Sequence, residues 1–256
     1  VKTNFTISED SLKGEFIYEK PNFNYTDNTL YTSFSNTSTD SIGDFGYKST
    51  ETSFSLGTRF EQYENLYFRP EIYNSYEKLE TTASASANLK KQEGSYFDTY
   101  FNYTLDYDKR NQVYQTSDGS RYVFYQEVPV VSDNYELLNT FEISKYKTFT
   151  GEMIGKISFY AQNVLSLGDK DVRISKRIYV PGSKLRGFER GKVGPKDGSD
   201  YIGGNFVSSF NFSSTLPQVL PNYENADFLF FLDVANIWGV DYDAALDDSS
   251  VRSSIG

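Results

Sequence analysis

The chain contains neither cysteine nor histidine among its 256 residues. Without thiols it has no disulfide and no thiolate metal site, and without imidazole it lacks the commonest general base and metal ligand. These absences remove most enzyme chemistry, so we expect no catalytic residue, no metal and no cofactor. The formal net charge of −10 is opposite in sign to the basic face that nucleic acid requires. We therefore expect no nucleic-acid partner.

Long apolar runs are also missing. The longest uninterrupted one is Phe228–Leu232, whereas a membrane-spanning helix needs about 20 apolar residues. Aromatic residues are abundant at 17%, almost all of them Tyr and Phe, although the mean hydropathy is only −0.55. If such a chain crosses a membrane, it does so as strands of a barrel, because only helices and closed barrels satisfy their backbone groups in hydrocarbon.

A period of two dominates the sequence and is clearest over residues 96–107. One face of this segment reads Phe97, Thr99, Phe101, Tyr103, Leu105 and Tyr107, and the other reads Tyr96, Asp98, Tyr100, Asn102, Thr104 and Asp106. A strand of about 12 residues exceeds the usual 5–6 of soluble sheets and suits a tilted membrane strand. The same alternation predicts strands over 2–8, 13–20, 28–38, 47–61, 66–80, 96–108, 120–130, 135–148, 152–164, 201–214 and 226–238, with another starting near 250.

The expected connections alternate between short and long, as in membrane barrels with short periplasmic turns and longer external loops. Short ones are expected at 62–65 and 148–151, and long ones at 39–46, 81–95, 165–200 and 239–249. Two connections depart from the trend, because 131–134 is short on the loop side and 215–225 is long on the turn side. The pattern favours an all-β antiparallel barrel, and a soluble β-sandwich stays open as the alternative.

The segment 180–205 is long, charged and rich in glycine. Loops beyond about 12–15 residues are usually functional or disordered. Arg186, Phe188 and Tyr201 offer anchors within it, so its glycines indicate tight turns and close backbone approach. A merely solvated surface loop is the other interpretation. These glycines are Gly182, Gly187, Gly191, Gly194, Gly198, Gly203 and Gly204.

Five ordered segments together resemble the BamA-type outer-membrane protein assembly factors, the bacterial surface antigen barrel family. Leu185-Arg186-Gly187-Phe188 is similar to the V/L-R-G-F motif on the long sixth external loop of that family. The other four segments are a turn within 106–120, the stretch 193–205, the strand 230–239 and the strand start 251–256. The resemblance covers about residues 96–256, whereas residues 1–95 fit only in strand rhythm.

The resemblance implies a sixteen-stranded transmembrane β-barrel whose long loop folds into the lumen between the eleventh and twelfth strands. Counting back, 2–8 is about the third strand and 226–238 the thirteenth. We thus interpret residues 1–256 as a partial barrel domain of roughly 11–12 strands, truncated at both ends, with the lumen loop at 165–200. The periplasmic POTRA domains and the strand that closes the barrel seam would lie outside this chain.

The resemblance also implies roles for individual residues. Arg186 would pair inside the lumen with the strand aspartate Asp233, and Phe188 would pack beside this pair, against lumen aromatics. Alternation independently places Asp233 opposite Phe230, Leu232 and Val234, and so toward the lumen, because a carboxylate in lipid is costly. Leu185, Gly187, Gly191, Gly194, Gly203 and Gly204 would shape the loop and the strand that follows it.

Two positions depart from the family pattern. Ser213 stands where the family commonly has a second carboxylate for the motif arginine, and whether Glu189 replaces it is left open. Ala235 replaces the glycine that follows the aspartate. The first departure puts the charge network in doubt, and neither departure changes the expected fold.

The function that the resemblance implies is the folding and insertion of other β-barrel proteins into the bacterial outer membrane. The partners would be the lipid bilayer, unfolded outer-membrane clients and accessory assembly lipoproteins. A client strand would pair at a weak seam by β-augmentation, without covalent chemistry. A TamA-like or two-partner-secretion translocation barrel and a passive porin stay open as alternatives.

Overall fold

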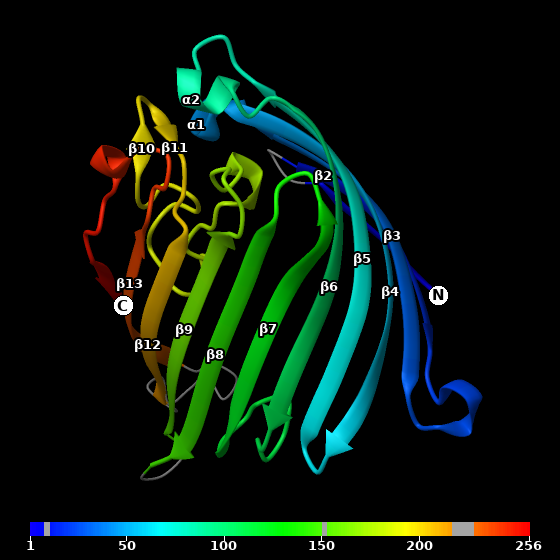
Figure 1. Ribbon diagram of the computed structural model, residues 1–256. Helices are drawn as coiled ribbons and strands as arrows, with labels where there is room; N and C mark the ends of the chain where they lie inside the picture. The colour runs from blue at the N-terminus through cyan, green and yellow to red at the C-terminus, as the bar shows by residue number, and fades with distance from the viewer. Residues whose placement is uncertain (8–10, 150–152, 217–227) are drawn as a thin grey trace.

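Twelve strands form one curved antiparallel sheet in the computed structural model, which describes residues 1–7, 11–149, 153–216 and 228–256. Each strand pairs with the next along the chain, except that β9 pairs with β12 across a long intervening segment (Figure 1). The strands are β1 (Lys2–Ile7), β2 (Ser11–Lys20), β3 (Thr29–Ser41), β4 (Tyr47–Tyr63), β5 (Leu66–Thr81), β6 (Gly94–Asp108), β7 (Gly119–Ser132), β8 (Glu136–Thr148), β9 (Ile154–Ser166), β12 (Phe206–Leu216), β13 (Phe228–Trp238) and β14 (Arg252–Ile255). Within the described residues, the edge strands β1 and β14 do not pair with each other, so the sheet is open.

The predicted all-β antiparallel fold is confirmed, with corrections at some strand ends. The strand predicted over 201–214 begins only at Phe206. The residues before it form a separate small hairpin, in which β10 (Lys196–Asp197) pairs with β11 (Asp200–Tyr201). Residue 8, residue 152 and residues 226–227, which the prediction placed in strands, lie outside the described residues.

The upper connections contain short helical turns that alternation did not predict. The segment 39–46 is only partly a loop, because β3 runs to Ser41 and α1 (Ile42–Phe45) follows it directly. The connection between β5 and β6 contains α2 (Ala87–Lys90), which is capped by the Ser86 side chain. Single turns η2 (Ile174–Lys176) and η3 (Ala244–Leu246) lie in later connections at the same end, whereas η1 (Phe23–Tyr25) lies between β2 and β3 at the other end of the sheet. Among the described residues, no helix is both long and apolar enough to cross a membrane.

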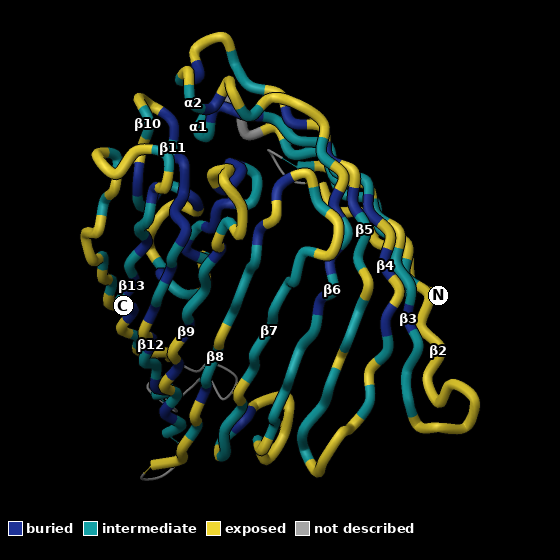
Figure 2. The backbone as a smooth tube through the Cα atoms, in the orientation of Figure 1, coloured by how far each residue is buried: buried dark blue, intermediate teal, exposed yellow. Residues whose placement is uncertain are grey.

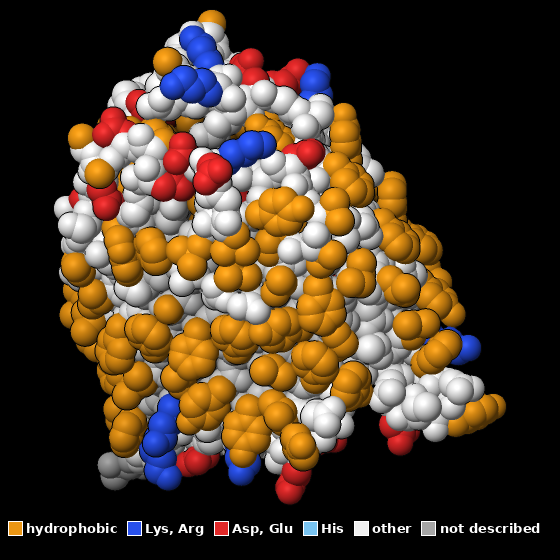
Figure 3. Space-filling model, viewed as in Figure 1, with side chains coloured by type: hydrophobic (Ala, Val, Ile, Leu, Met, Phe, Trp, Pro, Cys, Tyr) orange, Lys and Arg blue, Asp and Glu red, His pale blue; other side chains and the backbone are white. Residues whose placement is uncertain are grey.

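The two faces of the sheet differ in the way that alternation predicts. In β6, Asp98, Tyr100 and Asn102 are buried on the inner face, while Phe97 is 48% exposed on the outer face. Figure 3 shows hydrophobic side chains in a band around the middle of the outer face, with charged side chains gathered at its two ends. An apolar outer band around a polar interior is the arrangement of membrane barrels. The exposed apolar side chains include Phe16, Phe34, Phe54, Leu56, Ile72, Phe141, Ile157, Phe159, Phe210, Phe230 and Leu232.

The buried core lies between the inner wall and the segment 167–205, which joins β9 to β12 and is called the long loop below (Figures 1 and 2). Two clusters of buried apolar residues fill this space. The first joins loop residues Ile178, Val180, Leu185 and Val193 to wall residues Tyr160, Val207, Ala235 and Ile237. The second joins Ile174 and Ile202 of the loop to Tyr47, Leu79, Ala85, Leu89 and Val240. The loop is thus an integral part of the folded interior.

Candidate functional site

The long loop is rich in cations, although the chain as a whole is acidic. It carries nine Lys or Arg and five Asp or Glu, whereas the whole chain has a formal charge of −10. Two of these cations lie deep inside the molecule, because Arg173 is only 2% exposed and Arg177 only 4% exposed. Buried charges are stable only when they are paired and hydrogen-bonded. The site is therefore defined by the acidic groups that receive these cations.

The structure brings Arg186 and Asp233 into direct contact. Arg186 donates from Nε and Nη2 to the two carboxylate oxygens of Asp233, both at 2.7 Å, and its backbone N–H donates at 3.0 Å. Asp233 is 0% exposed, because its inward position on β13 lies under the loop. Asn211, its register partner on β12, donates a further bond at 2.9 Å. The Asp233 carboxylate is thereby saturated with donors.

The surroundings of this pair differ from the family pattern. Ser213 brings no second carboxylate to the motif arginine, and the polar neighbour of Asp233 is Asn211, whose amide also donates to the Lys184 carbonyl oxygen at 2.7 Å. The Glu189 side chain is 68% exposed and pairs with Lys192 at 2.7 Å, so it does not occupy the position that Ser213 leaves without charge.

The ring beside Arg186 belongs to Phe231, at 3.8 Å from the guanidinium carbon to the ring centroid. Phe188, expected against lumen aromatics, is 38% exposed and lines a surface cavity with Lys192, Tyr201 and Arg252. The aromatic partner of the motif arginine therefore comes from the wall strand and not from the motif itself.

Close packing explains the loop glycines. Gly194 has φ +105°, and a Cβ there would lie 2.5 Å from the Ile237 side chain. A Cβ at Gly204 would lie 2.5 Å from the Trp238 carbonyl oxygen. Gly187, Gly191 and Gly203 also have positive φ. The backbone thus runs against the wall at distances that a larger residue would prevent.

A second ionic cluster, which the sequence analysis missed, surrounds Arg173 at the start of the loop. Its Nη2 donates to Asp98 at 2.6 Å and to Glu136 at 3.0 Å, and its Nη1 lies 3.5 Å from Glu77. All four side chains are at most 3% exposed. The alternation of β6 did place Asp98 on the polar face, but no local pattern indicated which cation would meet it.

Three further loop cations pair with the wall or the neighbouring connection. Lys176 lies 3.5 Å from Glu51 on β4, and Lys184 lies 2.6 Å from Glu142 on β8. The buried Arg177 donates to Asp241, just beyond β13. In the sequence, the run Arg173-x-x-Lys176-Arg177 was the signal that could have indicated a cluster of paired cations at the start of the loop.

The charge state of the loop cations follows from these partners. Burial alone lowers the pKa of the Arg173 guanidinium, and the carboxylates of Glu136 and Asp98 reverse this, so the pKa lies above its ordinary value. Burial likewise lowers the pKa of Lys176, and Glu51 and its neighbours more than compensate, leaving it raised. Both groups therefore remain charged throughout the physiological range.

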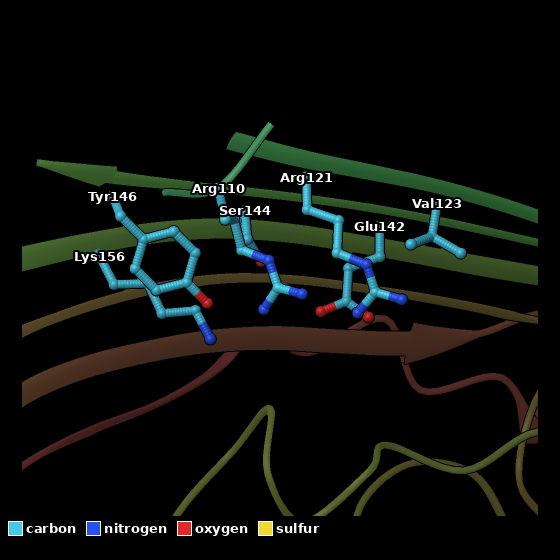
Figure 4. A pocket seen from close by; sticks show the side chains of 7 residues that line it. All are labelled: Arg110, Arg121, Val123, Glu142, Ser144, Tyr146 and Lys156. Carbon is cyan, nitrogen blue, oxygen red and sulfur yellow. The ribbon is translucent and has the colours of Figure 1, made fainter. Parts of the chain in front are cut away.

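A pocket of about 140 Å³ opens on the lower inner wall, where side chains of β7, β8, β9 and the β6–β7 connection converge (Figure 4). Arg110 is held by Asp108 at 2.6 Å and Arg121 by Asp106 at 2.7 Å, so both cations are already neutralised. Glu142, which also lines the pocket, holds the loop cation Lys184. The pocket thus extends the same wall-to-loop charge network.

Known proteins share both the sequence pattern and the fold. The human "Sorting and assembly machinery component 50 homolog" is 24% identical over 168 residues, which are 62% of this chain and 36% of that protein. A SAM50-like protein of Schizosaccharomyces pombe is 42% identical over 53 residues, which are 20% of this chain and 11% of that protein. The crystal structure of BamA from Haemophilus ducreyi lacking POTRA domains 1-3 superposes with a TM-score of 0.85 at 19% identity.

The structural match covers 99% of this chain and 56% of the BamA chain, so the chain spans about half of that structure and about a third of the human relative. At 19% identity the match shows a shared fold. The model of the Omp85 superfamily domain matches residues 1–256, the whole chain. By this match, the chain belongs to the Omp85 superfamily.

Proposed function

We propose that this barrel is the membrane-embedded part of a protein that folds and inserts other β-barrel proteins into an outer membrane. The full-length match to the Omp85 superfamily domain carries the proposal. The printed names of the relatives point to sorting and assembly in one case and to BamA in another. The apolar band on the outer face of the sheet supports a position of the barrel within the bilayer.

The proposed mechanism is templated strand pairing at a seam. An edge strand presents unpaired N–H and C=O groups, and a client strand that pairs there satisfies its own backbone before it enters hydrocarbon. The partners are the bilayer, unfolded β-barrel clients and accessory lipoproteins. No covalent bond is made or broken. The lumen loop, pinned at Arg186 and Asp233, supports this role by keeping the interior wall in shape while the seam opens.

The bacterial outer membrane is the compartment implied by the resemblance to BamA-type factors. Relatives also occur in human and in Schizosaccharomyces pombe, so the compartment needs its own test. Membrane fractionation of the source cells with an antibody against this chain provides it. Enrichment with outer-membrane markers is expected in a bacterial source, and enrichment in the inner membrane or in the soluble fraction contradicts the placement.

Reconstitution of the full-length protein into liposomes tests the activity. An unfolded eight-stranded β-barrel client is added, and its folding is followed by the shift of the folded band on unheated gels. The expected result is client folding at least about ten-fold faster than in empty liposomes, which corresponds to about 1.4 kcal/mol of barrier. Folding at the empty-liposome rate contradicts the proposal. A large steady conductance in that case identifies a porin, and transfer of an unfolded polypeptide into the liposome interior identifies a translocation barrel.

A further inference from the structure

We propose that Arg173 is a second anchor of the long loop, independent of the Arg186–Asp233 pair, and that the two anchors make the loop a brace across the lumen. Arg173 fastens the first turn of the loop to β5, β6 and β8, whereas Arg186 fastens its motif segment to β13. This inference concerns the barrel itself and holds whichever transport or assembly activity the full protein has.

Arg173 uses nearly all of its donors on the wall. Besides the contacts from Nη1 and Nη2, its Nε lies 3.3 Å from Glu136, and its backbone N–H donates to the same carboxylate at 2.7 Å. The wall carboxylates are in turn held by neighbouring polar groups. Ser132 donates to Asp98 at 2.5 Å, Asn134 to Glu136 at 2.8 Å and Ser175 to Glu77 at 2.9 Å. Such a connected buried network specifies one position for the loop start.

The two anchors are separate in the sheet and in the core. The carboxylates that bind Arg173 come from β5, β6 and β8. In the strand order, β9 and β12 lie between β8 and β13, which carries the partner of Arg186. The apolar neighbours differ as well. Ile174, next to Arg173, packs in one buried cluster, while Leu185, next to Arg186, packs in the other. Each of the two anchors therefore has its own ion pairs and packs against its own cluster of buried apolar residues.

Removing the Arg173 charge would leave three carboxylates facing one another inside the wall. Nη2 contacts Asp98 and Glu136 simultaneously, so these two carboxylates are close to a common atom. Like charges at such separations repel strongly when they are shielded from water. The loop start would then detach and admit water, while Arg186, Asn211 and Asp233 would still hold the motif segment.

Segment-resolved hydrogen exchange on the full-length protein in detergent tests the inference. Arg173→Met and Arg186→Met each remove the charge and keep an extended side chain, and Arg190→Met on the exposed loop surface is the matched control. Arg173→Met is expected to speed amide exchange over 172–178 at least about ten-fold, equivalent to about 1.4 kcal/mol. Exchange over 184–190 stays within about two-fold, and Arg186→Met gives the reverse pattern.

Two results overturn the inference. Unchanged exchange over 172–178 in Arg173→Met shows that Arg173 is not an anchor. Release of both segments by either variant shows a single cooperative unit instead of two anchors.

A double variant extends the test to the case in which Arg173→Met folds poorly, because its yield of folded barrel can still be compared. It also separates the effect of charge from the effect of side-chain shape. Adding Glu136→Gln to Arg173→Met removes one of the three facing carboxylates. Exchange over 172–178 is expected to slow about three-fold or more relative to Arg173→Met alone, and the yield of folded barrel is expected to rise. If Arg173 acts only by filling space, the second substitution adds to the damage, and this result also contradicts the proposal.

Discussion

The inner wall of the sheet is built differently where the long loop covers it and where it does not. Under the loop, the wall carries the buried carboxylates of Asp98, Glu136 and Asp233, each bonded to a loop arginine. On β3 and β4, short hydroxyl pairs line the inner face instead, with Ser33 and Ser55 joined at 2.8 Å. The carboxylates under the loop are thus fixed by loop arginines, whereas on β3 and β4 neutral hydroxyl pairs alternate with charged groups such as Glu51 around a cavity of about 320 Å³.

The difference shows how a polar interior is stabilised in two ways. The hydroxyl pairs of the uncovered part are neutral, so each pair there contributes only about 0.5–1.5 kcal/mol even where it is buried. Under the loop, water is displaced, and every charge depends on its partner. Substitutions in the two parts should therefore have very unequal effects, and the following predictions are ordered from the largest effect to the smallest.

The largest effect is expected for Asp233→Ala in the covered wall. It leaves Arg186 and Asn211 without their shared acceptor, and breaking a buried pair of this kind costs about 3–5 kcal/mol. Trypsin cleavage of the loop in folded protein should accelerate strongly, and the gel-shift unfolding temperature should fall. Asp169→Ala, on an exposed part of the same loop, is the control. Equal behaviour of the two variants would contradict the role of Asp233 in anchoring the long loop.

The next effect is expected on the outer face of the uncovered part. Leu56 on β4 is 49% exposed among the outward apolar side chains, and arginine near the bilayer midplane costs about 2–4 kcal/mol. Leu56→Arg should lower the yield of folded barrel in liposomes. The same charge on the inner face at the half-buried Ser33, in Ser33→Arg, should be tolerated better. The reverse ranking would mean that the faces have been assigned wrongly.

A smaller effect is expected for Ser55→Ala on the uncovered inner wall. The substitution removes one neutral hydroxyl pair with Ser33, worth about 0.5–1.5 kcal/mol. The gel-shift unfolding temperature measures it, and the Ser33→Ala/Ser55→Ala double variant should lose little more than either single one. A loss as large as that of Asp233→Ala would remove the contrast between the two parts of the wall.

No measurable effect is expected for Glu189→Gln. The Glu189 side chain is 68% exposed and pairs only with Lys192 among the contacts described, and surface pairs contribute about 0–1 kcal/mol. Loop proteolysis and unfolding temperature should match those of the unmodified protein. A loss comparable to that of Asp233→Ala would mean that Glu189 does serve as the second carboxylate of Arg186.

Much of the fold could be predicted because strand formation is encoded locally. Period-two alternation in 96–108 already separated Asp98 and Asn102 from Phe97, and the structure buries the first two and exposes the third. The errors are at short elements, such as the β10–β11 hairpin and the single turns α1 and α2. Four residues or fewer provide no period to detect, and their geometry is set by capping and by packing against the wall.

The candidate site divides in the same way. The meeting of Arg186 and Asp233 was predicted because the loop motif and the strand motif resemble known sequences. The Arg173 cluster could not be predicted, because its partners lie 37, 75 and 96 residues away along the chain. Many acids share the inward faces of the strands, and local sequence does not select which of them a loop cation will reach.

The sequence by itself determined the strand rhythm, the polar and apolar faces, the absence of thiol and imidazole chemistry and the presence of a cationic loop. These features depend on residue type and on the period of two, which neighbouring residues specify. Only the tertiary structure decided where the loop lies and which carboxylate each cation meets. The curvature of the sheet brings distant strands to one enclosed space, and buried charges there select the partners that leave none of them unpaired.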